Sequence, residues 1–564
     1  SDLAGCCDNP EGASTGRFDP AYPIERGLLS RDGWALIDDN IASSTLVQWE
    51  NSSTDVVDVW PFPLAEQRGS ASGSDWYFFG CGLDFRDCLE HFTRVAGNIA
   101  LPPLSGVGVW WSRHWGDESG NKAMVDDPRV GVMSESNLVA EVLTGYADRT
   151  LPLHIVVLDM EWHEMAPSPS CRGFLGVKKW GGYTWNRTLF PDPSGFATML
   201  HARSIPSSLP RLDGPMPIEL SLNFHPDSGV DNCQEHYADM GATLGLQSAV
   251  ASNATLPDLD GAMSYNKTYC DAYFKYMVDP SLVDHAWTDT PAATTWSNWL
   301  YVRNSRLPNL ATRAMEGINS GSNGVKTKKM ATAAKRTINF SRYGGIGDHR
   351  KPSGFSGDTL RKWDTLSYEV WFTPRASNVG FGWWSHDIGG FNGAFIDPDW
   401  HTEEPELFLR WLQFATYAPV FRTHCRYCDQ RVWSWSAYDS IVPRAQNKTW
   451  ETMMSATLHR RNQLVPYIYS HARLRTWASG ESLVTPMYWD RASASFDEAY
   501  SVATQQQYFF GRDLIVAPIT AKAAPAFGGD DTQRRAVGDE APSNASLKSF
   551  WLPATNDVWY ARES

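Results

Sequence analysis

The chain of 564 residues lacks two features that would direct it to a membrane or a nucleic acid. It has no apolar run approaching the roughly 20 residues that a helix needs to span a bilayer. It also has no basic excess, since 49 Lys and Arg stand against 64 Asp and Glu, for a formal net charge of −15. Nucleic acids and anionic lipid surfaces attract basic stripes, so the sequence predicts neither as a partner.

The start of the chain also lacks two signals. Ser1 is not an initiator Met, and no signal peptide follows it, which predicts a processed or trimmed chain. Seven N-x-S/T sequons are nevertheless present, and this surplus favours a glycoprotein that is secreted or held in the lumen of the secretory pathway. The sequons begin at Asn51, Asn186, Asn253, Asn266, Asn339, Asn447 and Asn544.

Cysteine is scarce, with nine in the whole chain, and an odd total leaves at least one thiol unpaired within it. The local clusters are Cys6 with Cys7, Cys81 with Cys88, and Cys425 with Cys428. The last of these follows His424 and has the spacing of half a zinc site, but no second pair lies nearby in the sequence. A disulfide or buried thiols are therefore favoured over a metal site.

Aromatic residues, in contrast, are abundant: they make up 13% of the chain and include 26 Trp. Their flat faces with polar edges suit sugar rings, although a large core uses them equally. With 42% hydrophobic and 20% charged residues, the composition is that of a globular protein. The length predicts two to four structural units, one of which can be a large barrel.

The hydrophobic pattern changes twice along the chain. Residues 1–95 are rich in short β-like runs, and only 84–97 has helical spacing with a Gly stop. Residues 96–490 alternate short apolar strands with helical segments, which predicts a (β/α)8 TIM barrel, an α/β fold. Residues 491–564 return to short β-like pieces and predict a C-terminal β-sandwich that stops early. The strands expected in the barrel are 107–111, 154–160, 217–225, 285–289, 336–342, 379–384, 419–424 and 483–489.

Charged side chains gather where these expected strands end, which is where a TIM barrel places its active site. Each of them has a structural alternative, because an Asp there often caps the next helix and an Arg often forms an ion pair. Their occurrence at successive strand ends favours a site. The candidates are Asp159, Glu161 and His163, then Asp289, Arg342, and Arg422 with His424.

Asp358 follows the Arg342 strand, in a Gly-Asp turn beside aromatic residues. Desolvation there would raise the proton affinity of the carboxylate and allow it to act as a general acid near neutral pH. A solvated Asp in an ordinary turn is the alternative.

The order and spacing of several motifs, from DFRDCLEHFTRVAGNIALPPLSGVGVWWSRHW through VVLDMEWH, GGYTWNRTLFPDP and GFSGDT to WWSHDIGGF and FGRDLIVAPI, resemble glycoside hydrolase family 31. This is the family of retaining α-glucosidases and α-xylosidases, and the resemblance covers nearly the whole chain. It implies that only part of an N-terminal β-sandwich is present in residues 1–95. It further implies an α-linked oligosaccharide or glucan as substrate, and no metal or organic cofactor.

The resemblance also implies the roles of individual residues. Asp289 matches the catalytic nucleophile and Asp358 the acid/base, while Asp284 is an alternative nucleophile. Four residues match groups that bind the sugar: Asp159, Arg342, His424 and Asp387. The expected aromatic walls of the sugar site are Trp287, Trp384, Phe355 and Phe391.

These roles are chemically consistent. A retaining glycosidase holds one ionised and one protonated carboxyl group about 5 to 5.5 Å apart. The charge of Arg342 would keep Asp289 ionised, and aromatic neighbours would keep Asp358 protonated. The expected activity is the release of α-glucose from non-reducing ends. An α-xylosidase, α-galactosidase, transglucosylase or α-glucan lyase on the same fold, and a catalytically silent carbohydrate-binding member, remain as alternatives.

Overall fold

The computed structural model describes part of the chain, and all structural statements below refer to that part. The described residues are 28–38, 76–114, 134–159, 162–164, 182–203, 216–224, 229–256, 272–278, 285–288, 336, 338–341, 349, 352–391, 404–426, 430–435, 449–490, 497–501, 505–522 and 551–552.

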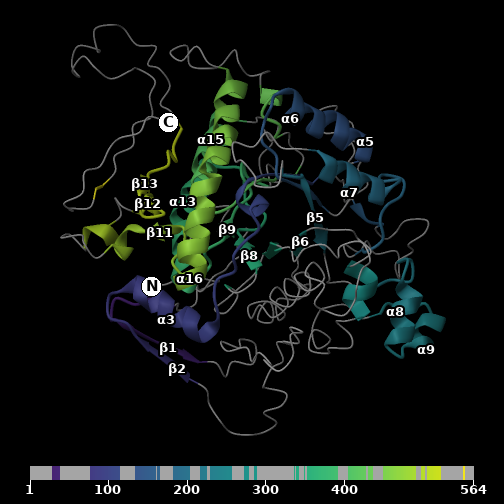
Figure 1. Ribbon diagram of the computed structural model, residues 1–564, viewed down its shortest axis with the longest axis horizontal. Helices are drawn as coiled ribbons and strands as arrows, with labels where there is room; N and C mark the ends of the chain where they lie inside the picture. Colours follow the sequence, from purple (N-terminus) through teal and green to yellow (C-terminus); the bar gives the residue numbers. More distant parts are fainter. Residues whose placement is uncertain are drawn as a thin grey trace.

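Eight of the described strands form one parallel sheet in the order β10-β3-β4-β5-β6-β7-β8-β9 (Figure 1). The strands are β3 (Val109–Arg113), β4 (Ile155–Leu158), β5 (Glu219–Phe224), β6 (His285–Thr288), β7 (Asn339–Ser341), β8 (Pro352–Phe355), β9 (Trp384–Ser385) and β10 (Phe421–Thr423). A parallel bridge between Ile388, just after β9, and Thr423 of β10 connects the two edges of this sheet. The parallel α/β sheet is thus confirmed, and the bridge supports the predicted closure into a barrel.

The central strands are buried along their whole length, as expected for a parallel sheet with helices against it. Every residue of β3, β4 and β5 is buried. The helices beside the sheet are α7 (Pro193–Ala202), α13 (Trp363–Ala376), α14 (Pro405–Thr416) and α15 (Trp450–His471). Helices α8 (Tyr237–Thr243) and α9 (Gln247–Ala251) pack against each other and lie farther from the strands (Figure 1). A further helical stretch runs from α5 (Glu135–Asn137) through a π-helical segment (Leu138–Leu143) into α6 (Thr144–Asp148).

Local sequence signals explain several helix ends. The predicted helix in 84–97 is α3 (Phe85–Ala96), which begins where the Asp84 side chain accepts a hydrogen bond from the Asp87 amide at 3.1 Å. Gly97 ends it with a φ of 91°, a conformation that side chains other than glycine rarely adopt. Asp192 and Thr449 cap α7 and α15 in the same way.

One strand prediction was wrong and one strand was missed. The segment 483–489 contains β11 (Val484–Pro486), which lies outside the parallel sheet and pairs antiparallel with β12 (Tyr508–Phe510). The missed strand is β8, whose sequence Pro-Ser-Gly-Phe has neither the β-branched residues nor the alternation that mark a strand. Its neighbours β7 and β9 supply the pairing that its own sequence does not indicate.

Two small antiparallel sheets flank the parallel one. The first pairs β1 (Trp34–Asp38) with β2 (Trp76–Gly80), and the second joins β11 and β12 with β13 (Leu514–Val516). They share one apolar cluster with α3, in which Phe79, Phe92 and Phe509 are buried together. The two predicted β-sandwiches and the domain boundaries at 95 and 490 stay predictions.

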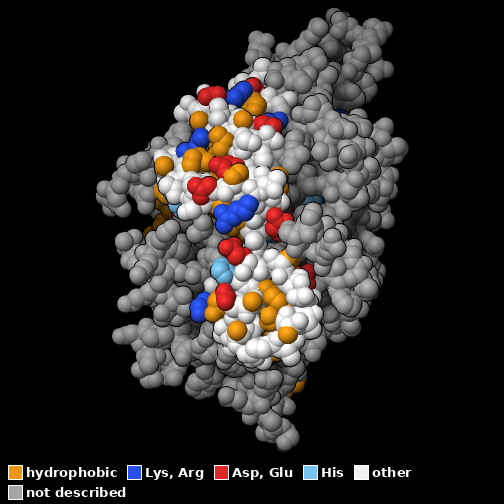
Figure 2. Space-filling view, turned by 90° about the vertical axis from the view of Figure 1, so that its right-hand side faces the viewer, with side chains coloured by type: hydrophobic (Ala, Val, Ile, Leu, Met, Phe, Trp, Pro, Cys, Tyr) orange, Lys and Arg blue, Asp and Glu red, His pale blue; other side chains and the backbone are white. Residues whose placement is uncertain are grey.

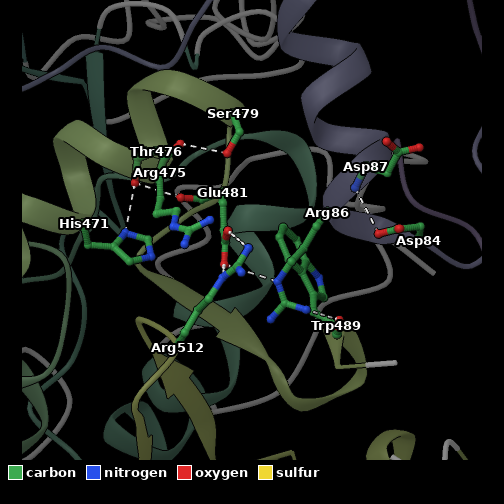
Figure 3. Close-up of polar contacts among 10 residues, drawn as sticks. All are labelled: Asp84, Arg86, Asp87, His471, Arg475, Thr476, Ser479, Glu481, Trp489 and Arg512. Carbon is green, nitrogen blue, oxygen red and sulfur yellow. Dashed lines mark hydrogen bonds and ion pairs between the residues drawn. The ribbon is translucent and has the colours of Figure 1, made fainter. Parts of the chain in front are cut away.

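A buried glutamate also connects α3 with the turn between β12 and β13. Glu481 follows α16 (Trp477–Ser479) and contacts Arg86 of α3 at 3.2 Å and Arg512 of the β12–β13 turn at 2.6 Å (Figure 3). Arg86 in turn donates a hydrogen bond to the Trp489 carbonyl. This set of contacts, the Glu481 cluster, fixes α3 and the β12–β13 turn to the end of the helical layer.

The cysteines that the structure describes are in disulfides. Cys81 bonds to Cys88, which links the end of β2 to α3. Cys233 and Cys425 are also disulfide-bonded, and for Cys425 this agrees with the preference for a disulfide over a zinc site. Among the described residues, no three His, Cys, Asp or Glu side chains are grouped to hold a metal ion.

One face of the molecule can be seen in Figure 2, and its described part shows no large patch of one charge. On the face that carries α5 to α9, acidic and basic side chains are interspersed with apolar ones (Figure 2). No helix in the described ranges combines the length and the apolarity needed to cross a membrane.

Candidate active site

Polar side chains converge at the carboxyl ends of the parallel strands. His114 follows β3, Asp159 follows β4, Asp387 lies two residues after β9, and His424 follows β10. Strands of a parallel sheet end at the same edge, so these residues, far apart in sequence, meet there. Each of the four is at least 96% buried.

Asp159 lies at the centre of this group. Its Oδ2 is 3.5 Å from His114 Nδ1 and 3.6 Å from His424 Nε2, and its Oδ1 accepts a hydrogen bond from Asn223 Nδ2 at 2.6 Å. Asn223 is held in place by Trp162, whose Nε1 donates to the Asn223 carbonyl at 2.8 Å. The carboxylate is therefore fixed by groups from three strands.

His424 is kept neutral by its surroundings. Burial, followed by the positive charge of Arg422 and the neighbouring His114, lowers its pKa well below the usual value. Its Nδ1 lies 2.7 Å from the Ser112 hydroxyl, and its Nε2 faces Asp159. With Ser112 donating to Nδ1, the proton of the neutral ring sits on Nε2, directed toward Asp159.

A second carboxylate, Asp387, forms a buried ion pair with Arg422 of β10. The Arg422 guanidinium lies 4.9 Å from the centre of the Phe355 ring, and Phe355 belongs to an apolar cluster with Trp110 of β3 and Ile155 of β4. An aromatic face below the guanidinium and a carboxylate beside it hold this cation in one orientation. Phe355 thus supports the polar group from below.

The adjacent His386 belongs to a different layer. Its Nδ1 accepts a hydrogen bond from Trp411 Nε1 at 3.0 Å, and its ring stacks on Phe414 at 4.7 Å, both on α14. Burial and the charge of Arg422 lower its pKa to about 3, so the ring is neutral. The contacts of His386 with α14 anchor the chain beside Asp387, whose own carboxylate meets Arg422.

An uncharged carboxyl group lies behind Asp387. Glu369 of α13 is fully buried. Burial is the main cause that raises its pKa to about 8. A hydrogen bond with Ser356 lowers the pKa, and the charge of Asp387 raises it. At neutral pH this side chain is mostly a protonated acid next to an ionised one.

Phe391 is the aromatic wall of the group. Its ring stacks on His424 with centroids 5.0 Å apart and an interplanar angle of 18°, and it lies 6.2 Å from the His114 ring. The Phe391 amide donates to the Thr359 carbonyl at 2.9 Å. This bond ties the Phe391 segment to the loop that carries Asp358, which is itself half-buried just after β8.

Trp384, also expected as a wall, is not brought into this group. Its ring packs against Phe372 at 4.8 Å and Phe381 at 5.9 Å, within the apolar cluster between β9 and α13. Adjacent strand residues point to opposite faces, so a Trp at this position that packs on the helix cannot also line the site.

The remaining predicted residues fall mostly outside the described ranges. This holds for Asp289, Arg342, Glu161 and the alternative nucleophile Asp284, while Trp287 is described only as a main-chain position in β6. Thr288 of β6 and Ser341 of β7 are register partners. In the sequence, Asp289 follows the first of these two and Arg342 follows the second.

Three residues of the Asp159 group were absent from the sequence prediction: Ser112, His114 and Asn223. The rule that selected Asp159 would have found two of them, since His114 follows one expected strand and Asn223 lies at the end of another. Ser112 lies inside β3, and its sequence context gives no signal.

Comparison with known proteins identifies relatives of this architecture. The family model described as "Glycosyl hydrolases family 31 TIM-barrel domain" matches residues 99–471, well over half of the chain. An α-xylosidase of Saccharolobus solfataricus is 22% identical over 487 residues, which are 84% of this chain and 56% of that protein. The α-subunit of glucosidase 2 of Saccharomyces cerevisiae is 21% identical over 501 residues, 85% of this chain and 46% of that protein.

Solved structures agree with the fold. The crystal structure of a family 31 α-xylosidase from Xanthomonas citri aligns with a TM-score of 0.55 and 21% identity, over 80% of this chain and 45% of that one. The chain thus spans about half the length of the relatives that it matches.

Proposed function

The chain belongs to glycoside hydrolase family 31, and on that basis we propose that it is a retaining α-glycosidase that removes one sugar at a time from non-reducing ends. The observation that carries this proposal is the buried group around Asp159 at the carboxyl ends of the strands. A fixed carboxylate accepts hydrogen bonds from vicinal hydroxyls, and the neutral His424 beside it adds a further hydrogen-bonding position. Such a set suits an uncharged pyranose.

The proposed reaction uses two displacements. Asp289 attacks the anomeric carbon while Asp358 protonates the leaving oxygen, which gives a β-linked glycosyl enzyme. Asp358 then takes a proton from water, and the water displaces Asp289 to restore the α configuration. Arg342 would hold Asp289 ionised, and Asp387 with Arg422 would complete the sugar site.

Glucose is the sugar that the sequence predicts, and xylose is a second candidate. The support for xylose is that relatives with sequence similarity and a solved structure with the same fold bear the name α-xylosidase, while the name glucosidase among the relatives supports glucose. The two sugars differ by the hydroxymethyl group of glucose. A difference of about one methylene in the size of the site changes the ratio of the two kcat/KM values by roughly 10- to 200-fold.

A proton NMR time course with p-nitrophenyl α-glucoside and α-xyloside tests the mechanism and the sugar together. We expect the α-anomer of the released sugar to appear first, before mutarotation, and the better substrate to show the higher kcat/KM by at least about tenfold. If the β-anomer appears first, the double displacement is wrong.

Variants at the two candidate nucleophiles provide a matched control. Asp289→Ala should abolish turnover, whereas Asp284→Ala, five positions earlier, should retain it. The reverse result would move the nucleophile to Asp284. If the wild type binds sugars without turnover and Asp289→Ala binds them equally well, the protein is the carbohydrate-binding alternative.

We further propose that the protein is a glycoprotein of the secretory pathway, supported by the Cys81–Cys88 disulfide. Of the described sequons, Asn253 is exposed after α9, whereas the Asn186 side chain accepts hydrogen bonds from the Thr188 and Leu189 amides. Asn253→Gln should therefore remove a glycan that shows as a mobility shift on deglycosylation, and Asn186→Gln should not.

A further inference from the structure

A cavity of about 290 Å³ lies between the flanking sheets and α13, and its wall has an unusual composition. The described residues that line it include two cations, Arg31 and Arg375, several aromatic rings, and no carboxylate. Arg31 is paired with Asp497 outside this wall, so Arg375 is the cation that suggests a site for an anion. The volume is near the lower end of the range for small-molecule sites, about 300 to 1,000 Å³.

The cavity is separate from the Asp159 group. Helix α13 begins at Trp363, on the side of the Asp358 loop, and ends at Ala376. With a rise of about 1.5 Å per residue, Arg375 lies roughly 18 Å along the helix from Trp363. A helix that follows a parallel strand runs back toward the amino ends of the strands, so the cavity lies at the opposite end of the sheet from the candidate active site.

The aromatic rings of the wall stack on each other and carry the two cations. Tyr488 and Tyr500 stack with centroids 4.6 Å apart and an interplanar angle of 6°. Trp371 and Tyr500 also each carry a guanidinium at 4.4 Å from the ring centre, Arg375 over the first and Arg31 over the second. Aromatic rings that contact cations in this way hold the two charges at the cavity wall.

The two arginines differ in their partners. Arg31 forms an ion pair with the exposed Asp497 at 2.7 Å. Arg375 donates one hydrogen bond to the Trp371 carbonyl at 2.6 Å, and no carboxylate in the described part of the chain is paired with it. Burial lowers the pKa of Arg375. An anion reaching this side chain would therefore replace a missing counter-charge.

We propose that this cavity binds a sugar acid of monosaccharide size, such as a hexuronate. The carboxylate pairs with Arg375, the ring lies against the aromatic wall, and the hydroxyls reach polar side chains such as Gln505. This site is independent of the glycosidase chemistry proposed above, because none of its residues belongs to the Asp159 group.

Isothermal titration of the whole chain with glucuronate, glucose and benzoate tests the proposal. We expect glucuronate to bind, glucose to bind at least about tenfold more weakly because it lacks the charge-assisted hydrogen bonds, and benzoate to bind more weakly than glucuronate because it has no hydroxyls. Glucose that binds as tightly as glucuronate and loses this binding in Arg375→Gln would overturn the role of the charge, since glucose bound at the Asp159 group would not respond to that variant. Equal binding of benzoate would overturn the choice of a sugar. Absence of glucuronate binding at millimolar concentration would overturn the site.

The matched variants are Arg375→Gln and Arg473→Gln. Arg473 also lies 4.4 Å over a tryptophan ring, Trp477, but it does not line the cavity. The first variant should weaken glucuronate binding about tenfold or more and leave glycosidase activity unchanged, and the second should leave both unchanged. Equal binding by wild type and Arg375→Gln would contradict the proposal. If Arg375→Gln does not fold, Gln505→Ala should weaken binding about threefold, and unchanged binding in that variant overturns the site.

Discussion

Two buried glutamates in different surroundings have opposite charge states. Glu369 of α13 is fully buried next to Asp387, and Glu481 is 3% exposed between Arg86 and Arg512 (Figure 3). Glu369 is fully buried and Glu481 nearly so, and the loss of hydration by itself favours the neutral acid in both. Among the described residues no cation pairs with Glu369 to offset this, and its pKa is raised to about 8.

For Glu481 the partners decide the balance. Burial again raises its pKa, but hydrogen bonds from Arg512 and the charges of Arg86 and Arg512 outweigh it, so the pKa is lowered. The difference teaches that the charge of a buried acid in this protein depends on which elements meet around it. At Glu481 two distant segments bring two cations, whereas at Glu369 the charge that acts on the pKa is that of another carboxylate, Asp387.

The largest effect should come from removing the cations at Glu481. The double variant Arg86→Met/Arg512→Met leaves an unpaired charge in a buried position, and we expect the free energy of unfolding to fall by about 4 kcal/mol. Urea denaturation at pH 7 measures this. A loss below about 1 kcal/mol would mean that the ion pairs of the Glu481 cluster contribute no more than exposed ion pairs do. Glu481 and Glu369 would then not differ as stated above.

The second prediction concerns Glu369→Gln, which keeps the shape of the neutral acid. The pKa of Glu369 is about 8 in the folded protein and 4.5 in the unfolded chain. Between pH 4.5 and pH 8 the unfolded chain has released this proton while the folded protein still holds it. The free energy of unfolding of the wild type therefore falls as the pH rises through this window. Gln removes this cost. We therefore expect the variant to be more stable by about 3 kcal/mol at pH 7 and equal to wild type at pH 4.

Urea denaturation of wild type and Glu369→Gln at both pH values measures the difference. A variant that is less stable at pH 7 would show that Glu369 is ionised and paired. In that case the two glutamates would not differ in charge.

The third prediction tests the neighbour of Glu481. Burial lowers the pKa of His471 to about 4, with Glu481 raising it and nearby arginines lowering it. The unfolded state takes up a proton below about pH 6.5 and the native state does so only near pH 4, so stability falls as pH drops across this window. Between pH 6.5 and pH 5, the free energy of unfolding of His471→Gln should therefore fall by about 2 kcal/mol less than that of the wild type.

Equilibrium unfolding at several pH values between 7 and 4 measures this slope. His91, which is exposed on α3, provides the matched control, because His91→Gln removes a histidine that water solvates. Equal slopes for His471→Gln and wild type would mean that His471 is already charged beside Glu481.

The smallest effect is expected where a glutamate has a cation but no burial. Glu90 and Arg94 pair on the surface of α3, with side chains 36% and 66% exposed. Glu90→Gln should change the free energy of unfolding by at most about 0.5 kcal/mol, because water screens the pair. A loss comparable to that at Glu481 would show that pairing matters more than burial.

The sequence predicted much of the candidate site because of one rule about parallel sheets. Asp159 and His424 were selected as strand-end residues and Asp387 from the family resemblance, and the structure brings all three to one edge of the sheet. Trp384 was expected there from the family resemblance, but its ring packs on α13. One position along the strand separates the two faces, and short strands do not reveal which face a residue takes.

The sequence by itself determined the family, the parallel α/β sheet, helix α3 with its Asp84 cap and Gly97 stop, and the acidic surface charge. These depend on periodicity, caps and composition, which are local or additive properties of the chain. Only the tertiary structure decided that β8 is a strand, that Glu369 is neutral and that Glu481 is ionised. Strand pairing and the pKa of a buried acid depend on groups that folding brings from distant parts of the chain, and no window of sequence contains them.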